Sequence, residues 1–334
     1  MLLAVFVLAG CQLFERDKVV SIDGQTMGTT FSVRWVDQDD ELVQLIRNKA
    51  GKALSTVNQQ MSTYIPNSEL SVFNALPADA QMDVSQPLAS LVSQALTLSE
   101  LSQGAFDVTV GPLVNLWGFG PNGRIDKAPS DDQIREVQAG IGYQNIAVLD
   151  SPARLQKFGQ QYVDLSAIAK GYGVDQLASV LESEGITNYL VEIGGELRAS
   201  GLKPDGTHWR IAIESPSTHE RSVGKIINVK DTAIATSGDY RNFFEENGVR
   251  FSHTLNPKTG RPITHRLASV TVLRPTCAEA DALATTLMVL GEHEGFEFAK
   301  QNGIAAYFLV KAELGDQFIE MATEEFEHFV QTEE

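Results

Sequence analysis

The chain has 334 residues, of which 43% are hydrophobic, enough for a substantial core and unlike the composition of a disordered protein. A net charge of −17 argues against a nucleic-acid-binding protein, which would carry a basic stripe, and against a polybasic membrane-binding patch. The two cysteines, Cys11 and Cys277, provide neither a disulfide framework nor a zinc-binding spacing.

The N-terminal segment is apolar and uncharged over residues 1–10, but it is too short to cross a bilayer as a helix. It is typical of the hydrophobic part of a secretory signal, and Leu8-Ala9-Gly10-Cys11 resembles a bacterial lipobox, in which the cysteine is lipidated. We therefore predict a signal and tether over residues 1–18, a lipid anchor at Cys11 on the periplasmic face of the inner membrane, and one domain over residues 19–334. The alternative is an ordinary buried N-terminal strand.

The first part of the chain predicts mostly helix and loop. Residues 32–36 alternate weakly and predict a strand. Apolar residues at helical spacing predict amphipathic helices over 40–60 and 85–102, the second closed by Gly104. Residues 115–130 are rich in glycine, proline and asparagine, which predicts a loop.

From residue 143 onward the pattern changes to short strands, with helices predicted over 168–184, around Asp281 and over 294–302. Gly194-Gly195 and Asn247-Gly248 are typical of tight hairpin turns. The predicted strands are 145–149, 161–165, 189–193, 196–200, 209–214, 226–229, 242–246, 249–255, 268–273, 307–310 and 318–321. Because hairpins outnumber strand–helix–strand units, we expect an α+β fold with a largely antiparallel sheet core and packed helices.

A first candidate site lies where the helix around Asp281 begins. Thr276 and Glu279 fit a capping box, and Asp281 and Thr285 are spaced to share one face of the helix. A carboxylate and a hydroxyl placed together are oxygen ligands suited to Mg²⁺. The alternative is structural: an early Asp favours the helix dipole, and a mid-helix Thr often bonds back to its own turn.

A second candidate site is the junction between a predicted strand and a predicted helix at Asp164, Ser166 and Lys170. Ser166 is a reasonable N-cap, and the free N–H groups of the helix could face an anion with Lys170 within reach. The alternative is that Asp164 and Ser166 merely cap the helix and that Lys170 is a solvated surface lysine.

Two further residues could serve a substrate. His253 precedes a turn that contains Pro257 and Gly260, and a histidine can accept a proton from an attacking hydroxyl near neutral pH. Tyr64 ends the first helix and could stack on a flat heterocycle. The alternatives are a structural strand histidine and an aromatic side chain in the core.

Taken in order, these motifs resemble the ApbE family, the FAD:protein FMN transferases. The blocks that carry the resemblance are 27–29, 61–64, 104–109, 164–171, 192–196, 253–260 and 280–285. The resemblance covers nearly the whole chain and implies an ApbE-like, T-fold-like α+β fold with an antiparallel sheet core.

The resemblance also implies an activity. The family transfers the FMN half of FAD to a threonine hydroxyl of an acceptor protein, releases AMP and uses Mg²⁺. It implies magnesium ligands at Asp281, Thr285 and the main-chain oxygen of Ala167, and a catalytic base at His253. The implied FAD-contacting residues are Met27, Tyr64, Ala105, Phe106, Asp107, Asp164, Lys170 and Leu255. The family often has a glutamate at the position of Lys170, so a lysine there could contact phosphate instead of ribose or base.

Two other functions stay open from the residues alone. One is a Mg²⁺-dependent pyrophosphatase that cuts FAD into FMN and AMP with water as the acceptor. The other is a non-catalytic periplasmic flavin-binding lipoprotein. For the transferase, membrane subunits of sodium-pumping or electron-transferring respiratory complexes are candidate acceptors, by analogy with the family.

Overall fold

The computed structural model describes residues 17–330 except 38–39, 122, 124, 126, 216–221, 240–242, 247–248 and 315–316. Cys11 and most of the predicted signal and tether lie outside the described residues, as does the predicted turn at Asn247-Gly248. Within the described part of the chain, no helix combines the length and hydrophobicity needed to cross a bilayer.

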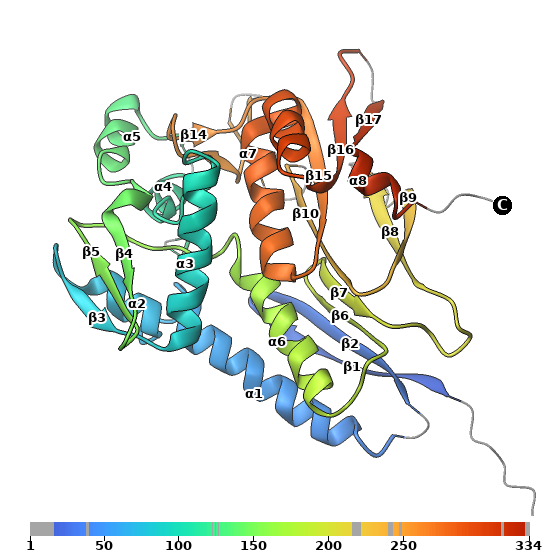
Figure 1. The fold of residues 1–334 in the computed structure, drawn as a ribbon. Coiled ribbons are helices and arrows are strands. Elements are labelled where there is room, and N and C mark those ends of the chain that lie inside the picture. Colours follow the sequence, from blue (N-terminus) through green and yellow to red (C-terminus); the bar gives the residue numbers. More distant parts are fainter. Residues whose placement is uncertain are drawn as a thin grey trace, which may run out of the picture.

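An eight-stranded sheet forms the centre of the fold, in the order β1-β2-β6-β7-β10-β15-β16-β17 (Figure 1). Every neighbouring pair is antiparallel, which confirms the predicted α+β class with an antiparallel sheet. The strands are β1 (Lys18–Thr26), β2 (Thr29–Asp37), β6 (Tyr189–Ile193), β7 (Glu196–Ser200), β10 (Thr232–Gly238), β15 (Leu267–Arg274), β16 (Ala305–Lys311) and β17 (Phe318–Ala322).

The sequence did not predict β1 or β10, although β10 lies in the middle of the sheet. β10 contains small residues such as Ala233 and Ala235, both buried, where most central strands have large β-branched ones. The predicted strand at 161–165 is wrong, because its hydrogen bonds go elsewhere. The Asn74 side chain bonds both the N–H and the C=O of Val163, each at 2.8 Å. The Asp164 N–H donates to the carbonyl of Val108 at 2.7 Å.

Three long helices cover one face of the sheet: α1 (Val43–Met61), α6 (Ala169–Ser183) and α7 (Cys277–Gln301) (Figure 1). Within α7 the backbone leaves helical geometry at Gly291, with φ 80° and ψ −176°. There His265 Nε2 donates to the carbonyl of Met288 at 2.8 Å. A Cβ on Gly291 would lie 2.7 Å from the His265 ring, so the break requires glycine. The helix predicted at 294–302 is the segment that follows this break.

The other face of the sheet packs against the hairpin of β8 (Trp209–Ser215) and β9 (Ser222–Val229) and against the short helix α8 (Glu324–Glu327). Trp209, Ile227 and Phe326 are buried in this second core. The Phe326 ring stacks on Tyr307 of β16, with ring centroids 5.1 Å apart. Both faces of the central sheet are therefore covered.

A smaller lobe packs beside the sheet, at the left of Figure 1. Its elements are α2 (Glu69–Ala75), β3 (Gln81–Asp83), α3 (Gln86–Leu101), α4 (Gly111–Leu116), α5 (Asp131–Gln138), the 3₁₀ turn Tyr143–Asn145, β4 (Ile146–Leu149) and β5 (Arg154–Lys157). Two short hairpins complete the fold: β11 (Phe243–Glu246) with β12 (Val249–Ser252), and β13 (Leu255–Asn256) with β14 (Arg261–Pro262). The predicted pairing of 242–246 with 249–255 is confirmed for β11 and β12.

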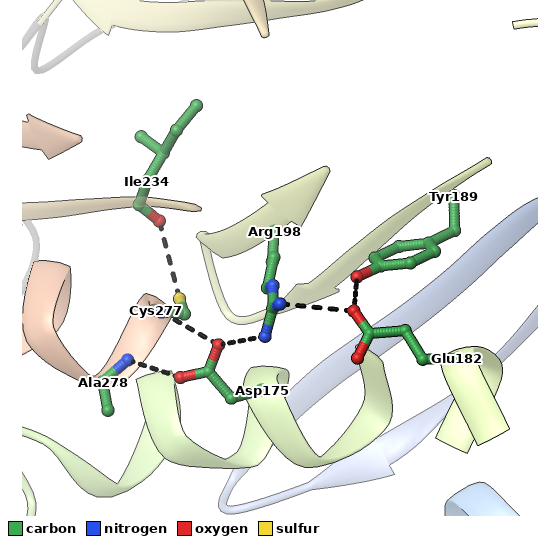
Figure 2. Close-up of polar contacts among 7 residues, drawn as sticks. All are labelled: Asp175, Glu182, Tyr189, Arg198, Ile234, Cys277 and Ala278. Atoms are coloured by element: carbon green, nitrogen blue, oxygen red, sulfur yellow. Dashed lines mark hydrogen bonds and ion pairs between the residues drawn. The ribbon is translucent and has the colours of Figure 1, made fainter. Parts of the chain in front are cut away.

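The N-termini of α6 and α7 meet, and each is closed by a carboxylate of the other helix. Asp175 of α6 accepts from the N–H groups of Cys277 and Ala278 at 3.0 and 2.9 Å (Figure 2). Asp281 of α7 accepts from the N–H of Gly171 at 3.0 Å. These are the first-turn donors that have no partner within their own helix. The two helix starts are therefore fixed relative to each other.

Two capping predictions from the sequence are wrong because of this exchange. Thr276 is the N-cap of α7 but makes no side-chain cap hydrogen bond, and Glu279 instead pairs with Arg274. Ser166 does not cap α6, whose N-cap residue is Ile168. In both helices the local cap is replaced by a carboxylate that is distant in sequence, so local spacing could not reveal it.

Arg198 of β7 holds Asp175 in its capping position. Its guanidinium donates to Asp175 at 3.1 Å and to Glu182 at 3.2 Å, and Tyr189 donates to the same Glu182 (Figure 2). Burial raises the pKa of Asp175, while the two capped amides and Arg198 act to lower it. Cys277 is fully buried, and burial raises the pKa of its thiol, so it is a packed residue.

Gly171 allows the two helices to approach, and its replacement tests the junction. A Cβ there would lie 2.2 Å from the carbonyl oxygen of Cys277. We predict that Gly171→Ala lowers the free energy of unfolding by about 1–3 kcal/mol. Gly51→Ala is the control, because Gly51 is exposed in α1 with nothing within 4 Å of its Cβ position. It should raise the free energy of unfolding by roughly 0.5–1 kcal/mol. Urea denaturation measures both, and equal effects would contradict the prediction.

Candidate functional site

A cavity of about 1290 Å³ opens where the starts of α6 and α7, the ends of the central strands and the smaller lobe meet. Every site residue predicted from the sequence, apart from Cys11, lines it. They are Met27, Tyr64, Ala105, Phe106, Asp107, Asp164, Ala167, Lys170, His253, Leu255, Asp281 and Thr285. Their placement in one cavity does not test the role predicted for each, and those roles stay predictions.

The predicted magnesium ligands lie on two elements at the helix junction. Asp281 is 5% exposed, and Thr285 lies one helical turn further along α7, with its hydroxyl 3.5 Å from that of Ser237. Ala167 lies in the turn that leads into α6. Burial raises the pKa of Asp281, while Lys170 and the Gly171 amide act to lower it.

These residues fit a hard cation. The described residues contain no cluster of three or more His, Cys, Asp or Glu side chains of the kind that holds many metals. The predicted set has a different composition: one buried carboxylate, one hydroxyl and one main-chain carbonyl, from residues that line the cavity. Mg²⁺ accepts such a sparse oxygen set because it keeps several waters and is shared with substrate phosphates.

Lys170 is tied to carboxylates and is not the solvated surface lysine of the structural alternative. Its ammonium group pairs with Glu196 of β7, a residue that sequence reasoning did not select. Burial raises the pKa of Glu196 to about 7, although Lys170 pulls it down. Burial lowers the pKa of Lys170, but Asp281 and Glu196 outweigh that effect and raise it. The sequence signals for Glu196 were its place beside the turn at Gly194-Gly195 and its membership of the motif block 192–196.

The two other predicted carboxylates are engaged in turns of the cavity wall. Asp107 accepts from the N–H and hydroxyl of Thr109 at 2.8 and 2.6 Å. Asp164 accepts from the N–H and hydroxyl of Ser166 at 2.8 and 2.5 Å. Tyr64 is 63% exposed at the cavity wall, so the alternative that it is a core aromatic is wrong.

His253 follows the end of β12 and reaches the cavity from a different part of the fold. Its ring lies edge-on to Phe119, with centroids 6.3 Å apart. The segment that follows His253 is held by side-chain hydrogen bonds to its main-chain carbonyls. Trp117 Nε1 donates to the carbonyl of Gly260 at 2.9 Å, and Gln138 donates to the carbonyls of Pro257 and Lys258 at 3.0 and 2.7 Å.

Two cations of the cavity wall were also missed. Arg34 of β2 and Arg210 of β8 are exposed and line the cavity. In the sequence each is an ordinary polar residue of an alternating strand, and nothing local marks either one. Only the packing of β8 and β9 over the sheet brings them to one cavity.

Comparison with known proteins identifies relatives over the whole described fold. The model of the ApbE family matches residues 27–308. The FAD:protein FMN transferase of Vibrio cholerae is 46% identical over 333 residues, which is 98% of this chain and 97% of the relative. The FAD:protein FMN transferase of Haemophilus influenzae is 45% identical over 335 residues, covering 98% and 95%.

Comparison with solved structures points to the same family. The flavin transferase ApbE from Vibrio cholerae superposes with a TM-score of 0.86 at 46% identity, covering 94% of this chain and 100% of that chain. With the family model matching most of its residues and with relatives of this similarity, the chain belongs to the ApbE family.

Proposed function

We propose that this protein transfers the FMN half of FAD to a threonine hydroxyl of an acceptor protein and releases AMP. One observation carries the proposal most directly: Asp281 and His253, from distant segments, line one cavity together with the predicted FAD-contacting residues. The relatives named FAD:protein FMN transferase support the same reaction.

In the proposed reaction the acceptor oxygen attacks the phosphorus on the riboflavin side of the FAD pyrophosphate. A bond forms between that phosphorus and the acceptor oxygen, and its bond to the bridging oxygen breaks. AMP leaves with the bridging oxygen. His253 accepts the proton of the attacking hydroxyl as general base. No covalent enzyme intermediate is needed, which agrees with the inert, buried Cys277.

Asp281, Thr285 and the carbonyl of Ala167 would hold the metal. A bound Mg²⁺ supplies neutralisation of phosphate charge as the anhydride breaks. This help is needed because the chain carries a net charge of −17, which repels a pyrophosphate. Asp281 would bind the cation while it still accepts the hydrogen bond from the Gly171 N–H that fixes the start of α6.

The pyrophosphatase is the main competing function. It uses the same cavity, with water in place of the acceptor hydroxyl. Release of AMP from FAD at the full rate without an acceptor protein would favour it. Mass spectrometry of the acceptor after incubation with FAD and Mg²⁺ should instead show an FMN adduct on a threonine.

We predict that His253→Ala lowers the rate of FMN transfer by about 10²–10⁴-fold, because the attacking hydroxyl then lacks its general base. Binding of FAD, followed by flavin fluorescence, should persist. His293→Ala is the matched control, because His293 is exposed on α7 and does not line the cavity. A His253→Ala enzyme that transfers FMN at the normal rate would exclude His253 as the base.

We predict that Mg²⁺ stabilises the wild-type protein by roughly 2.7 kcal/mol at about 100 times its dissociation constant. Asp281→Asn should abolish most of this gain, because it removes the buried charge that binds the cation. Glu297→Gln, an exposed change on the same helix, should leave it intact. Thermal unfolding with EDTA or Mg²⁺ measures the gain. An unchanged response in Asp281→Asn would remove the metal from this position.

We propose further that Cys11 carries a lipid that holds the protein at the periplasmic face of the inner membrane. The apolar segment 1–10 and its junction with Cys11 support this. Cys11→Ser should abolish incorporation of radiolabelled palmitate in cells and move the protein to the soluble fraction. Undiminished labelling of Cys11→Ser would place the lipid elsewhere.

A further inference from the structure

Part of the cavity lies against the strand β8, away from the helix junction. Arg210, Ile211, Ala212, Ile213 and Glu214 are consecutive, and all of them line the cavity. Neighbouring side chains of a strand point to opposite faces of the sheet. A cavity that touches all of these residues therefore runs along the edge of the strand, and the β8 edge forms one of its walls.

The register shows which backbone groups this edge presents. The Asn228 N–H of β9 donates to the carbonyl of Phe329 at 3.1 Å, on the side away from β8. A strand residue directs its N–H and C=O to the same side, so Asn228 does not bond β8. Its partner Arg210 then directs its own N–H and C=O away from β9. Ala212, two residues further on, does the same.

Among the described strands, β8 pairs with β9 alone, so the outward groups of Arg210 and Ala212 meet no other strand. Such an edge is a template for an added strand. The facing wall of the cavity includes Leu190 and Leu197 of the central sheet. The volume of about 1290 Å³ also exceeds the roughly 300–1,000 Å³ of an ordinary small-molecule pocket. The cavity is therefore larger than one ordinary small ligand requires.

The charge along this edge indicates the chemistry of that occupant. Arg34 and Arg210 are exposed on the cavity wall. Arg210 also borders an adjoining hollow with His208 and with Lys203, whose ammonium group pairs with Asp205 of the same hollow. In a chain with a net charge of −17, Arg34 and Arg210 form a small basic region at the start of β8, while Glu214 lines the cavity near the end of the strand. Such a region favours a partner segment with acidic side chains.

We propose that an extended, acidic segment of the acceptor protein adds as a strand to the free edge of β8. This inference rests on the proposed transferase function and names how its protein substrate is held. Main-chain hydrogen bonds to Arg210 and Ala212 supply affinity, and the acidic side chains contact Arg34 and Arg210. The acceptor and FAD then occupy adjoining parts of one cavity, as direct transfer requires.

The test replaces the outward N–H of Ala212. Proline is tolerated at an edge position whose N–H bonds no neighbouring strand, so Ala212→Pro should fold. The probe is the flavin-free periplasmic domain of a threonine-flavinylated subunit of a sodium-pumping respiratory complex. We predict a KM for this domain that is about tenfold higher, the loss expected for one or two main-chain hydrogen bonds. The KM for FAD should stay unchanged.

A second pair of variants tests the charge of the edge. Arg210→Glu should also raise the KM for the acceptor, and Arg210→Lys, which keeps the positive charge, should have a KM close to that of the wild type.

Ser21→Pro is the matched control on another edge. Val36 of β2 donates its N–H to Asn188 at 2.9 Å, and Arg34 directs its N–H to the same side. The partner of Arg34, Ser21 of the outermost strand β1, therefore directs its N–H outward, as Ala212 does. Ser21 is exposed and does not line the cavity, so its replacement should leave both KM values unchanged.

The outcomes separate the docking proposal from the transferase function. If the wild type transfers FMN and Ala212→Pro has a normal acceptor KM, the docking proposal is wrong and the function stands. If Ala212→Pro raises the KM for FAD instead, this edge binds the dinucleotide and the proposal is again wrong. If the wild type forms no adduct, the proposed transferase function is wrong, and amide hydrogen exchange then tests the docking proposal by itself. The acceptor domain should then slow exchange at the amides of Arg210 and Ala212, and unchanged exchange would overturn the proposal.

Discussion

The exchange of carboxylate caps between α6 and α7 is the constraint on which the rest of the site depends. Two helix N-termini carry like partial charges and unpaired N–H groups, so they do not meet without compensation. Asp175 and Asp281 place a negative charge at each start and satisfy those donors. Gly171 lets the backbones approach closely. The residue proposed to bind the cation is therefore also part of the helix packing, which fixes its position before any ligand arrives.

Around this junction the protein surrounds negative groups with a few well-placed cations. Lys170 lies between Asp281 and Glu196, and Arg198 holds Asp175 from the neighbouring strand. These ion pairs satisfy charges that would otherwise be costly to bury. They also explain how an acidic chain forms the proposed site for an acidic dinucleotide. The carboxylates around the junction cap helices or pair with cations, and Asp281, one of the caps, also lies in a position suited to a divalent cation.

The proposed reaction needs three groups from separate parts of the fold. The helix junction contributes the oxygen ligands, and the segment after β12 contributes His253. That segment is positioned by α4, α5 and their small core around Trp117 and Leu255. The β8 edge contributes a wall for the protein substrate. Each group lies on a separately packed part of the fold, so a change in the β8 edge can affect the acceptor without affecting the proposed metal ligands.

The sequence by itself determined the features that arise from local pattern: the amphipathic helices α1, α3 and α6, the hairpins β6–β7 and β11–β12, the antiparallel α+β class and the motif blocks that line the cavity. Tertiary structure decided whatever depends on distant partners. The caps of α6 and α7 come from Asp281 and Asp175, not from Ser166 and Thr276. β10 has small residues that give no strand pattern, yet it is central because α7 packs closely over it. Glu196, Arg34 and Arg210 join the site only through sheet and hairpin packing, because hydrogen bonds and charge pairs between distant segments leave no periodic trace in the sequence.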